Sequence, residues 1–387
     1  MLRSIAIENY RSIISLKAEL NFVNVITGAN GTGKSNLYKS LKLLTDIAKG
    51  NIINSIANQG GLNSCFWAGP EKISRRMERE EVLIQGTKSK NKKQLKLGFS
   101  SDEFSYSMTL GLPPASKMTF FKLDPEIKEE FIWLGDTYRR ASLLTERKST
   151  ILKVRDNKKW RTIDTNLEAT KSILNHMNKL GTSPEILAIR DNILDWRFYD
   201  SFRTDESAPS RSVKIGSEAL ILNSNGSNLA SALQTILERD KAEDLHQSIE
   251  DAFPGSTLSI EPLEGNRLSV NLKQKGLLRS LSSEELSDGT LKYLLLVAAL
   301  LSPLPPKLMI LNEPENSLNP NLLGALAKLI LKASNKSQII VASNSTELVN
   351  YLVGKDSVNL IELKKDLGRT QIEGQTMTNQ PPWHWPS

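Results

Sequence analysis

The stretch that decides the fold of this chain is Gly28-Ala29-Asn30-Gly31-Thr32-Gly33-Lys34-Ser35, which fits the pattern G-x-x-x-x-G-K-[ST] at every fixed position. An apolar run, residues 22–27, precedes it and predicts a buried strand. Apolar residues recur at helical spacing in residues 36–49, which follow it. In such a strand–loop–helix unit, backbone N–H groups and the helix N-terminus converge on phosphate oxygens. The sequence therefore predicts a phosphate-binding loop, which we call the cradle.

Each polar residue of the cradle has an expected role. Lys34 is predicted to reach the β- and γ-phosphates of a nucleotide and to act in catalysis, and the Ser35 hydroxyl is predicted to bind Mg²⁺. The predicted nucleotide-binding residues of this region are Asn30, Gly31, Thr32, Gly33, Lys34, Ser35 and Asn36.

Two further motifs follow near the other end of the chain. Residues 285–290 read ELSDGT and open an apolar helix predicted for residues 291–301. Residues 308–315 read LMILNEPE and predict a short buried strand that ends in polar and acidic residues. Either motif alone could be a helix cap or a strand end. Their order after the cradle is the specific signal.

In this order the three motifs resemble the Walker A, signature and Walker B series of ABC ATPases. The resemblance implies that two protomers sandwich two ATP molecules, and that Ser287 and Gly289 of one chain contact the γ-phosphate held by the other. It implies that Glu313 is the general base that orients the attacking water. Asn312 stands where most ABC heads have Asp and is expected to help hold Mg²⁺. The implied cofactors are ATP and Mg²⁺.

Within that superfamily, the chain is similar to soluble bacterial ATPases of the RecF, SMC and OLD-like group, often labelled AAA-family ATPases. The long separation of the cradle from Asn312 disfavours a transporter subunit. We expect an α/β P-loop fold of ABC-head type with an antiparallel β lobe, formed by residues 1–50 and 210–387, and a mixed β and helical insertion in residues 51–209. Besides the three motifs, the resemblance rests on residues 7–12, 196–200, 252–255, 312–318 and 382–386.

The chain departs from these relatives at two places. They usually have Ser-Leu-His-Pro where this chain has Ser317-Leu318-Asn319-Pro320. They also usually carry a switch histidine after the next strand, where this chain has Ser343-Asn344-Ser345. Asn344 is expected to donate a hydrogen bond to the γ-phosphate, but it carries no positive charge. Slow hydrolysis is therefore expected, because transition-state stabilisation is weaker. The Q-loop glutamine has two candidates, Gln59 and Gln85.

The formal net charge of +7 is concentrated in the predicted insertion. Residues 139–161 contain nine Lys or Arg and two Asp or Glu, and Lys88, Lys90, Lys92, Lys93 and Lys96 form a second basic run. Such patches suit the phosphate backbone of double-stranded DNA. They also suit an acidic protein partner, or they could be solvated loops.

Composition predicts a cytoplasmic protein. No apolar stretch is long enough for a transmembrane helix, and the N-terminus lacks the apolar block of a signal peptide. The single cysteine, Cys65, suits a reducing compartment and is expected to be a small buried hydrophobe. The three histidines have no metal-ligand spacing.

Two classes of function remain open. The first is an ATP-gated dimeric switch in DNA-linked genome maintenance or anti-phage defence. The second is a scaffold ATPase that oligomerises and holds or releases a separate effector, a toxin or a nuclease. The sequence ends soon after Glu362, so we expect no Toprim nuclease domain of the OLD type.

Local patterns also predict elements outside the motifs. Residues 3–27 are expected to form two strands, and residues 95–100 and 104–110 a hairpin. Further strands are predicted at residues 81–86, 119–122, 131–134 and 151–154, and around residues 258–272. A helix is predicted from Pro184 to about Tyr199, followed by a loop or linker in residues 205–216.

Overall fold

The computed structural model describes the chain except for residues 71–78, 80, 82–92, 115–117, 157–158, 176–182, 201, 240 and 377. The chain divides into two compact units. The first unit contains Met1–Asn21, Gly28–Asp195 and Ile361–Ser387, and the second contains Phe22–Thr27 and Trp196–Leu360. The predicted division into a head and an insertion has other boundaries than these two units, and it stays a prediction.

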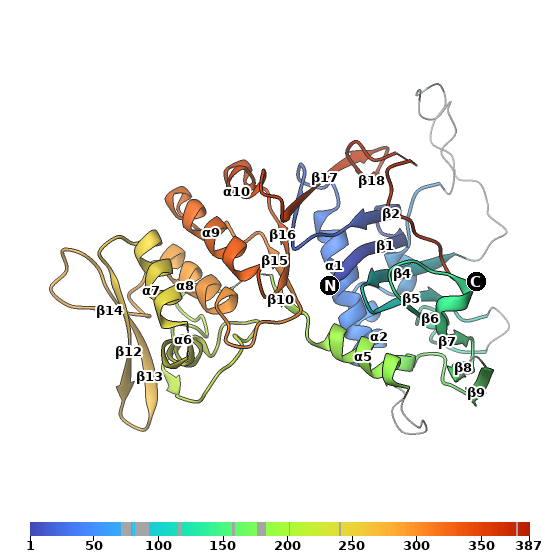
Figure 1. Cartoon of the computed structure of the whole chain (residues 1–387), viewed down its shortest axis with the longest axis horizontal. Coiled ribbons are helices and arrows are strands. Elements are labelled where there is room, and N and C mark those ends of the chain that lie inside the picture. The colour runs from blue at the N-terminus through green and yellow to red at the C-terminus, as the bar shows by residue number, and fades with distance from the viewer. Residues whose placement is uncertain are drawn as a thin grey trace. The chain divides into compact units, whose positions relative to one another are not determined.

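The first unit is built on an eight-stranded antiparallel sheet, in the order β2-β1-β4-β5-β6-β7-β8-β9 (Figure 1). Burial alternates over the first four residues of β8, whereas β5 is buried from Ser105 to Gly111. The strands are β1 (Leu2–Tyr10), β2 (Ile13–Glu19), β4 (Gln94–Ser101), β5 (Phe104–Gly111), β6 (Glu126–Leu134), β7 (Leu143–Lys148), β8 (Ile151–Asp156) and β9 (Lys159–Asp164).

The helices of this unit are α1 (Lys34–Ala48), α2 (Ile52–Ala57), α3 (Leu62–Cys65) and α5 (Pro184–Leu194). In α1, Leu37, Leu41, Leu44 and Ile47 are buried, as their spacing predicts. The C-terminal tail packs on the sheet. The ring centroids of Trp383 and Trp133 lie 5.6 Å apart in an edge-to-face arrangement. Trp383 therefore contributes to the core of this unit, and Trp385 packs against the same cluster.

The second unit contains parallel strands in the order β10-β15-β16-β3, namely β10 (Arg197–Tyr199), β15 (Leu308–Asn312), β16 (Gln338–Ala342) and β3 (Val23–Thr27). The sheet continues through β17 (Val358–Asp366), whose residues are divided between the two units, to β18 (Arg369–Ile372). The parallel strands β15, β16 and β3 are buried along nearly their whole length, as expected of strands covered on both faces.

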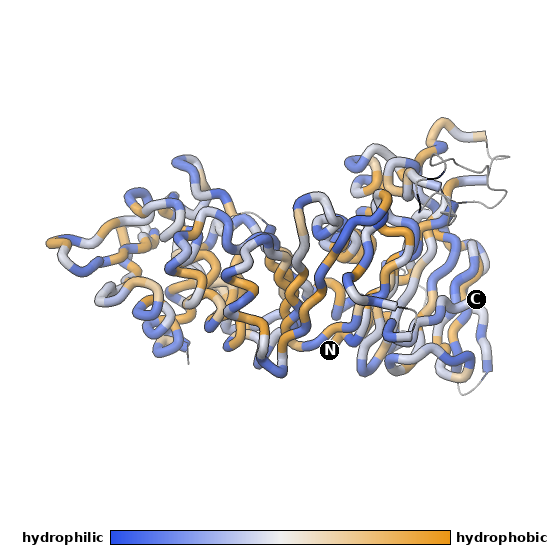
Figure 2. Tube along the Cα trace, turned by 90° about the horizontal axis from the view of Figure 1, so that it is seen from above, coloured by the Kyte–Doolittle hydropathy of each residue, from blue (hydrophilic) through white to orange (hydrophobic). Residues whose placement is uncertain are grey.

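Helices α6 (Leu229–Glu238), α7 (Ala242–Ala252), α8 (Asp288–Leu300), α9 (Leu323–Ala333) and α10 (Thr346–Leu352) complete the second unit, with a small sheet of β11 (Lys214–Ile215), β12 (Thr257–Leu263), β13 (Arg267–Lys273) and β14 (Leu281–Ser282). Every residue of α8 from Thr290 to Leu300 is buried, so this helix is the centre of the core. Hydrophobic and hydrophilic stretches alternate along the trace in Figure 2.

The hairpin of β4 and β5, the pair of β12 and β13, and the strands β6 and β8 confirm the local predictions. Three predictions are wrong. Residues 3–27 form three strands instead of two, residues 119–122 form no strand, and the helix predicted to reach Tyr199 ends at Leu194. The strand predicted for residues 81–86 lies outside the described residues. In the described part of the chain, no helix is long and apolar enough to cross a membrane.

Candidate functional site

The cradle joins β3 to α1 and has a backbone that only glycine adopts easily. The φ angles of Gly28, Gly31 and Gly33 are 142°, 82° and 115°. An added Cβ at Gly28 would overlap the carbonyl oxygen of Leu363, and one at Gly33 would overlap the Thr370 hydroxyl. The glycines of the motif are therefore required by both conformation and space.

The Lys34 side chain is folded back onto the loop. Its ammonium group donates to the carbonyl oxygens of Gly28 and Ala29, over 2.5 and 3.1 Å. Lys34 is 7% exposed, whereas Ser35 at the start of α1 is exposed. These contacts hold the cation inside the loop, where the motif expects the phosphates.

Two residues that sequence reasoning did not assign brace the cradle. The Thr370 hydroxyl donates to the carbonyl oxygen of Thr32 over 2.7 Å and lies 2.7 Å from the Ser12 hydroxyl. The Asn36 amide in turn donates to the Ser12 hydroxyl over 2.6 Å. Ser12 lies in one of the stretches that carry the family resemblance, but nothing in the sequence identifies Thr370.

In the second unit, the ends of two adjacent parallel strands bring Glu313 and Asn344 together. Glu313 follows β15 with a left-handed φ of 47°, and Asn344 follows β16. The Asn344 amide donates to Glu313 Oε1, and the Asn316 amide donates to Glu313 Oε2, each over 2.7 Å. Both carboxylate oxygens are therefore held by amide donors, which fixes the orientation of the predicted base.

The second glutamate of the motif fixes the segment that carries Asn344. Glu315 Oε1 accepts hydrogen bonds from the Ser343 hydroxyl and from the backbone N–H groups of Asn344 and Ser345, over 2.8, 2.7 and 3.1 Å. A carboxylate that accepts three bonds from one turn holds that turn in place. Glu315 thus positions Asn344, a role that the sequence did not predict.

Asn312, the predicted metal ligand, is paired with an acid to which no sequence motif assigns a role. Its amide nitrogen donates to Asp200 Oδ1 over 2.7 Å, because β10 and β15 are parallel neighbours that end together. Burial lowers the pKa of Lys292 on α8, and the carboxylates of Glu315 and Asp200 oppose that effect. A cation and two acids therefore surround the end of β15.

The signature residues lie at the N-terminus of α8. The Ser287 hydroxyl accepts a hydrogen bond from the Thr290 backbone N–H over 3.2 Å and caps the helix. A Cβ on Gly289 would lie 2.8 Å from the Ser317 carbonyl oxygen, so glycine allows the helix to approach the loop after Glu313. A depression of about 310 Å³ opens beside Ser287 and Gly289, and its lining also includes Phe253 and Asn319.

The structure thus gathers the predicted residues into local groups. The first unit holds the group of Asn30, Gly31, Thr32, Gly33, Lys34, Ser35 and Asn36. Within the second unit, Glu313 and Asn344 are in contact, and Ser287 and Gly289 share one helix end. The described residues contain no group of three or more His, Cys, Asp or Glu suited to a metal ion.

Of the two Q-loop candidates, Gln59 is engaged within the first unit. Its side-chain oxygen accepts hydrogen bonds from the Tyr10 hydroxyl and the Arg11 guanidinium, each over 2.9 Å. Gln85 lies outside the described residues. Cys65 is buried, as expected, and burial raises the pKa of its thiol.

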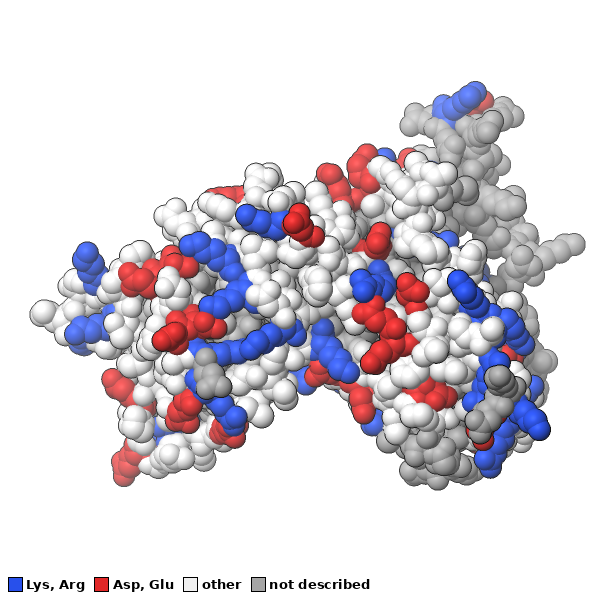
Figure 3. Space-filling model, viewed as in Figure 1, with Lys and Arg blue, Asp and Glu red and all other residues white. Residues whose placement is uncertain are grey.

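The basic surface predicted for residues 139–161 is only partly a surface. Arg147 is 0% exposed and forms a 2.8 Å ion pair with Glu130, so it belongs to the core and not to a nucleic-acid interface. The exposed cations of β7 to β9 are Lys148, Lys153, Lys159 and Arg161, and Figure 3 shows Lys and Arg side chains gathered over these strands. Lys158 and most of the second basic run lie outside the described residues.

The fold and the cradle define a P-loop ATPase domain of the ABC, RecF and SMC type. The family model described as "AAA domain, putative AbiEii toxin, Type IV TA system" matches residues 23–350, and the chain belongs to this family. No curated protein matches the chain.

Two solved structures of SMC heads are similar in fold. One, an SMC head bound to the C-winged helix domain of ScpA, has a TM-score of 0.52 at 12% identity and covers 97% of this chain and 98% of its own. The other, from Pyrococcus furiosus, has an extended coiled coil and is bound to the C-terminal domain of ScpA. Its TM-score is 0.51 at 12% identity, with 96% and 95% coverage. At this identity the likeness establishes the fold.

Proposed function

We propose that the chain is an ATP-binding and slowly hydrolysing ABC-type ATPase that acts as an ATP-gated dimeric switch in genome maintenance or anti-phage defence. The observation that carries the proposal is the geometry of the cradle. Its glycines have the backbone that lets N–H groups converge, and the Lys34 ammonium is held inside the loop by two carbonyl oxygens. Phosphate oxygens are charged acceptors and would replace those neutral carbonyls as partners of the cation.

The residues proposed for the metal have suitable chemistry. Mg²⁺ prefers oxygen ligands and supplies charge neutralisation for the phosphates when it is bound. The Ser35 hydroxyl is exposed at the start of α1. The Asn312 amide nitrogen is engaged by Asp200, which leaves the carbonyl oxygen as the ligand atom of that side chain. The Asp200 carboxylate adds the negative charge that Asn312 itself lacks.

Glu313 is proposed to orient the attacking water and accept its proton. Its carboxylate is held by Asn344 and Asn316, so its direction is fixed before the nucleotide arrives. Asn344 brings no positive charge to the γ-phosphate. We therefore propose a low rate of hydrolysis, which suits a switch that stays closed while ATP remains bound.

The dimer is proposed to form through the signature. The N-terminus of α8 carries the partial positive charge of a 13-residue helix and opens onto the depression beside Ser287. In the proposed dimer, Ser287 and the Gly289 backbone contact the γ-phosphate held by the cradle of the second chain. ATP binding and assembly are then linked, because neither chain completes the site alone.

The ATP-binding part is tested with Lys34→Ala, measured by the binding of a fluorescent ATP analogue. We expect binding to be abolished, because the cradle loses its cation. Lys42→Ala is the matched control, since Lys42 lies exposed on the same helix, and we expect it to bind normally. Unchanged affinity in Lys34→Ala would refute the ATPase proposal.

The dimer part is tested with Ser287→Arg. The long cation should block dimerisation while the monomer binds ATP normally. Ser224→Arg, on an exposed loop of the same unit, is the control. If Ser287→Arg leaves both turnover and assembly intact, the signature does not act across a dimer.

A second function, a scaffold that holds a toxin or nuclease effector, is favoured by one specific observation. The loop of residues 118–123 exposes four large apolar side chains, Met118, Phe120, Phe121 and Leu123. Exposed apolar groups of this kind are typical of contacts with another protein. An effector that co-purifies with the wild type should be lost from Phe120→Ser/Phe121→Ser, which should still bind ATP. Retention of the effector by that variant would argue against this contact.

A further inference from the structure

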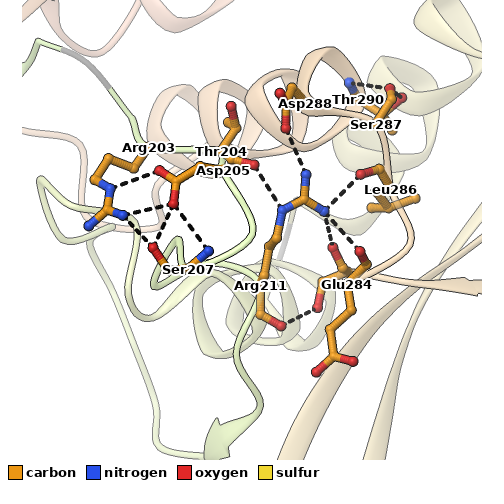
Figure 4. A network of polar contacts seen from close by, with 11 residues as sticks. Arg203, Thr204, Asp205, Ser207, Arg211, Glu284, Leu286, Ser287, Asp288 and Thr290 are labelled. Carbon is orange, nitrogen blue, oxygen red and sulfur yellow. Dashed lines mark hydrogen bonds and ion pairs between the residues drawn. The ribbon is translucent and has the colours of Figure 1, made fainter.

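One buried arginine of the second unit makes most of its contacts with the segment that leads into the signature helix. Arg211 lies between β10 and β11 and is 8% exposed. Figure 4 shows its guanidinium enclosed by backbone carbonyl groups and by the Asp288 carboxylate.

Each nitrogen of the guanidinium donates at least one hydrogen bond. Nε donates to the Thr204 carbonyl oxygen over 2.8 Å, and Nη2 donates to Asp288 Oδ1 over 2.8 Å. Nη1 faces three carbonyl oxygens, those of Ser283, Glu284 and Leu286, at 2.9, 3.1 and 2.8 Å. The Ser283 hydroxyl returns a bond to the Arg211 carbonyl oxygen over 2.9 Å.

This arrangement fixes the path of residues 283–286. The carbonyl groups of Ser283, Glu284 and Leu286 all turn toward Arg211 Nη1. A buried carbonyl group that loses its donor is costly, so loss of the guanidinium should destabilise this conformation of residues 283–286. A lysine could not replace it, because one ammonium does not reproduce the planar set of donors.

Arg211 also offsets a negative charge at the N-terminus of α8. Asp288 is the acidic residue in the first turn of α8, and its side chain is 61% exposed. A carboxylate at that place would repel a phosphate that approaches Ser287. Its ion pair with Arg211 offsets the negative charge and turns the carboxylate toward the guanidinium.

We propose that Arg211 is the positioning residue of the signature: it holds residues 283–286 and neutralises Asp288, so that Ser287 and Gly289 face a partner chain's nucleotide. This inference rests on the proposed ATP-linked dimer. Arg211 touches neither the cradle nor the proposed base in its hydrogen bonds, so its effect is on assembly and not on the binding of ATP to one chain.

The same loop offers a matched control. Arg203 forms hydrogen bonds with Asp205 and Ser207, close to it in sequence, and its side chain is 60% exposed (Figure 4). Arg203→Lys therefore removes a guanidinium from the same loop without removing a contact with residues 283–288.

The experiment compares Arg211→Lys and Arg203→Lys in the Glu313→Gln background, which prevents turnover. We expect Arg211→Lys to bind a fluorescent ATP analogue as tightly as its parent, and its ATP-driven dimer to be at least about 10-fold weaker, the loss of roughly one charge-assisted hydrogen bond. Arg203→Lys should match the parent in both measurements. A dimer of parental strength in Arg211→Lys would overturn the inference.

A second measurement separates this inference from the proposed dimer. Amide hydrogen exchange of the full chain without nucleotide should be faster in Arg211→Lys, within residues 283–290 only. If the parent does not dimerise with ATP, the proposed function fails, and exchange alone decides the role of Arg211. Unchanged exchange in residues 283–290 would refute that role whether or not the chain dimerises.

Asp288→Asn tests whether Arg211 acts by neutralising Asp288, because this change removes the carboxylate charge and keeps the side chain's size. If Arg211 offsets the charge of Asp288, removal of that charge should leave the ATP-driven dimer within about threefold of the parent. A 10-fold or greater weakening would contradict the charge component of the inference.

Discussion

The amide of Asn344 donates a 2.7 Å hydrogen bond to the carboxylate of Glu313, and this contact links the end of β16 to the end of β15. The family resemblance implies that Asn344 lies in the segment where relatives usually carry a switch histidine. The residue that should sense the γ-phosphate is therefore already bonded to the residue that should activate the water. A change at either position is expected to affect hydrolysis more than binding.

The first prediction concerns Asn344. Asn344→Ala removes a donor that orients Glu313, and we expect phosphate release to slow about 10-fold while ATP affinity stays within twofold. Asn344→His restores a donor that can carry positive charge and should raise turnover above wild type. Steady-state phosphate release measures both. Identical rates in the two variants and the wild type would contradict a role for this position.

The second prediction concerns Asp200, whose carboxylate is bonded to the Asn312 amide. Asp200→Ala removes the negative charge behind the proposed metal ligand, so the Mg²⁺ concentration needed for half-maximal ATP binding should rise about 10-fold. Asp205→Ala is the control, because Asp205 pairs with Arg203 on an exposed loop. An unchanged Mg²⁺ requirement in Asp200→Ala would remove Asp200 from the metal site.

The third prediction is about stability. Arg147 and Glu130 are both 0% exposed, and Glu130 also accepts hydrogen bonds from the Tyr106 and Ser172 hydroxyls. Arg147→Ala leaves a buried carboxylate without its cation, so the free energy of unfolding of the first unit should fall by about 3–5 kcal/mol. Lys148→Ala, at the exposed neighbour, should change it by less than about 0.5 kcal/mol. Chemical denaturation measures both, and equal effects would contradict the assignment of Arg147 to the core.

Some parts of the fold and of the candidate site could be predicted from the sequence, and others could not. The cradle, β15 and α8 were predictable because each depends on neighbours along the chain, through an apolar run, a spacing or a glycine. Alternation along β7 does not say which face is buried, and its pairing with β6 and β8 decides that Arg147 points inward. Charge density alone therefore overestimated the basic surface.

Long-range partners explain the other differences. Residues 197–199 are a strand only because they pair with β15, more than a hundred residues away, so the local helical pattern extended too far. Asp200 and Thr370 were missed for the same reason, since their partners Asn312 and Thr32 are distant in sequence. Arg211 lies in a stretch that the sequence presents as a loop or linker.

The fourth prediction concerns the exposed basic face of β7 to β9. If it binds double-stranded DNA, charge reversal to Glu at Lys148, Lys153, Lys159 and Arg161 should abolish a duplex shift and spare ATP binding. The wild-type shift should weaken steeply with salt and show little sequence preference. Reversal of four exposed lysines of the second unit, Lys307, Lys328, Lys332 and Lys336, is the control for total charge. The absence of a wild-type shift at both low and moderate salt would rule out DNA binding by this face and leave an acidic protein partner or a solvated surface.

The proposal that ATP binding drives dimerisation is tested most directly with Glu313→Gln, because this change removes the proposed base and keeps the side chain's size. We would measure the mass of the Glu313→Gln protein in solution with Mg²⁺ and ATP, with Mg²⁺ and ADP, and without nucleotide. We expect the mass of two chains with ATP only and the mass of one chain in the other two conditions. One unchanged mass in all three conditions, with bound ATP verified, would contradict it.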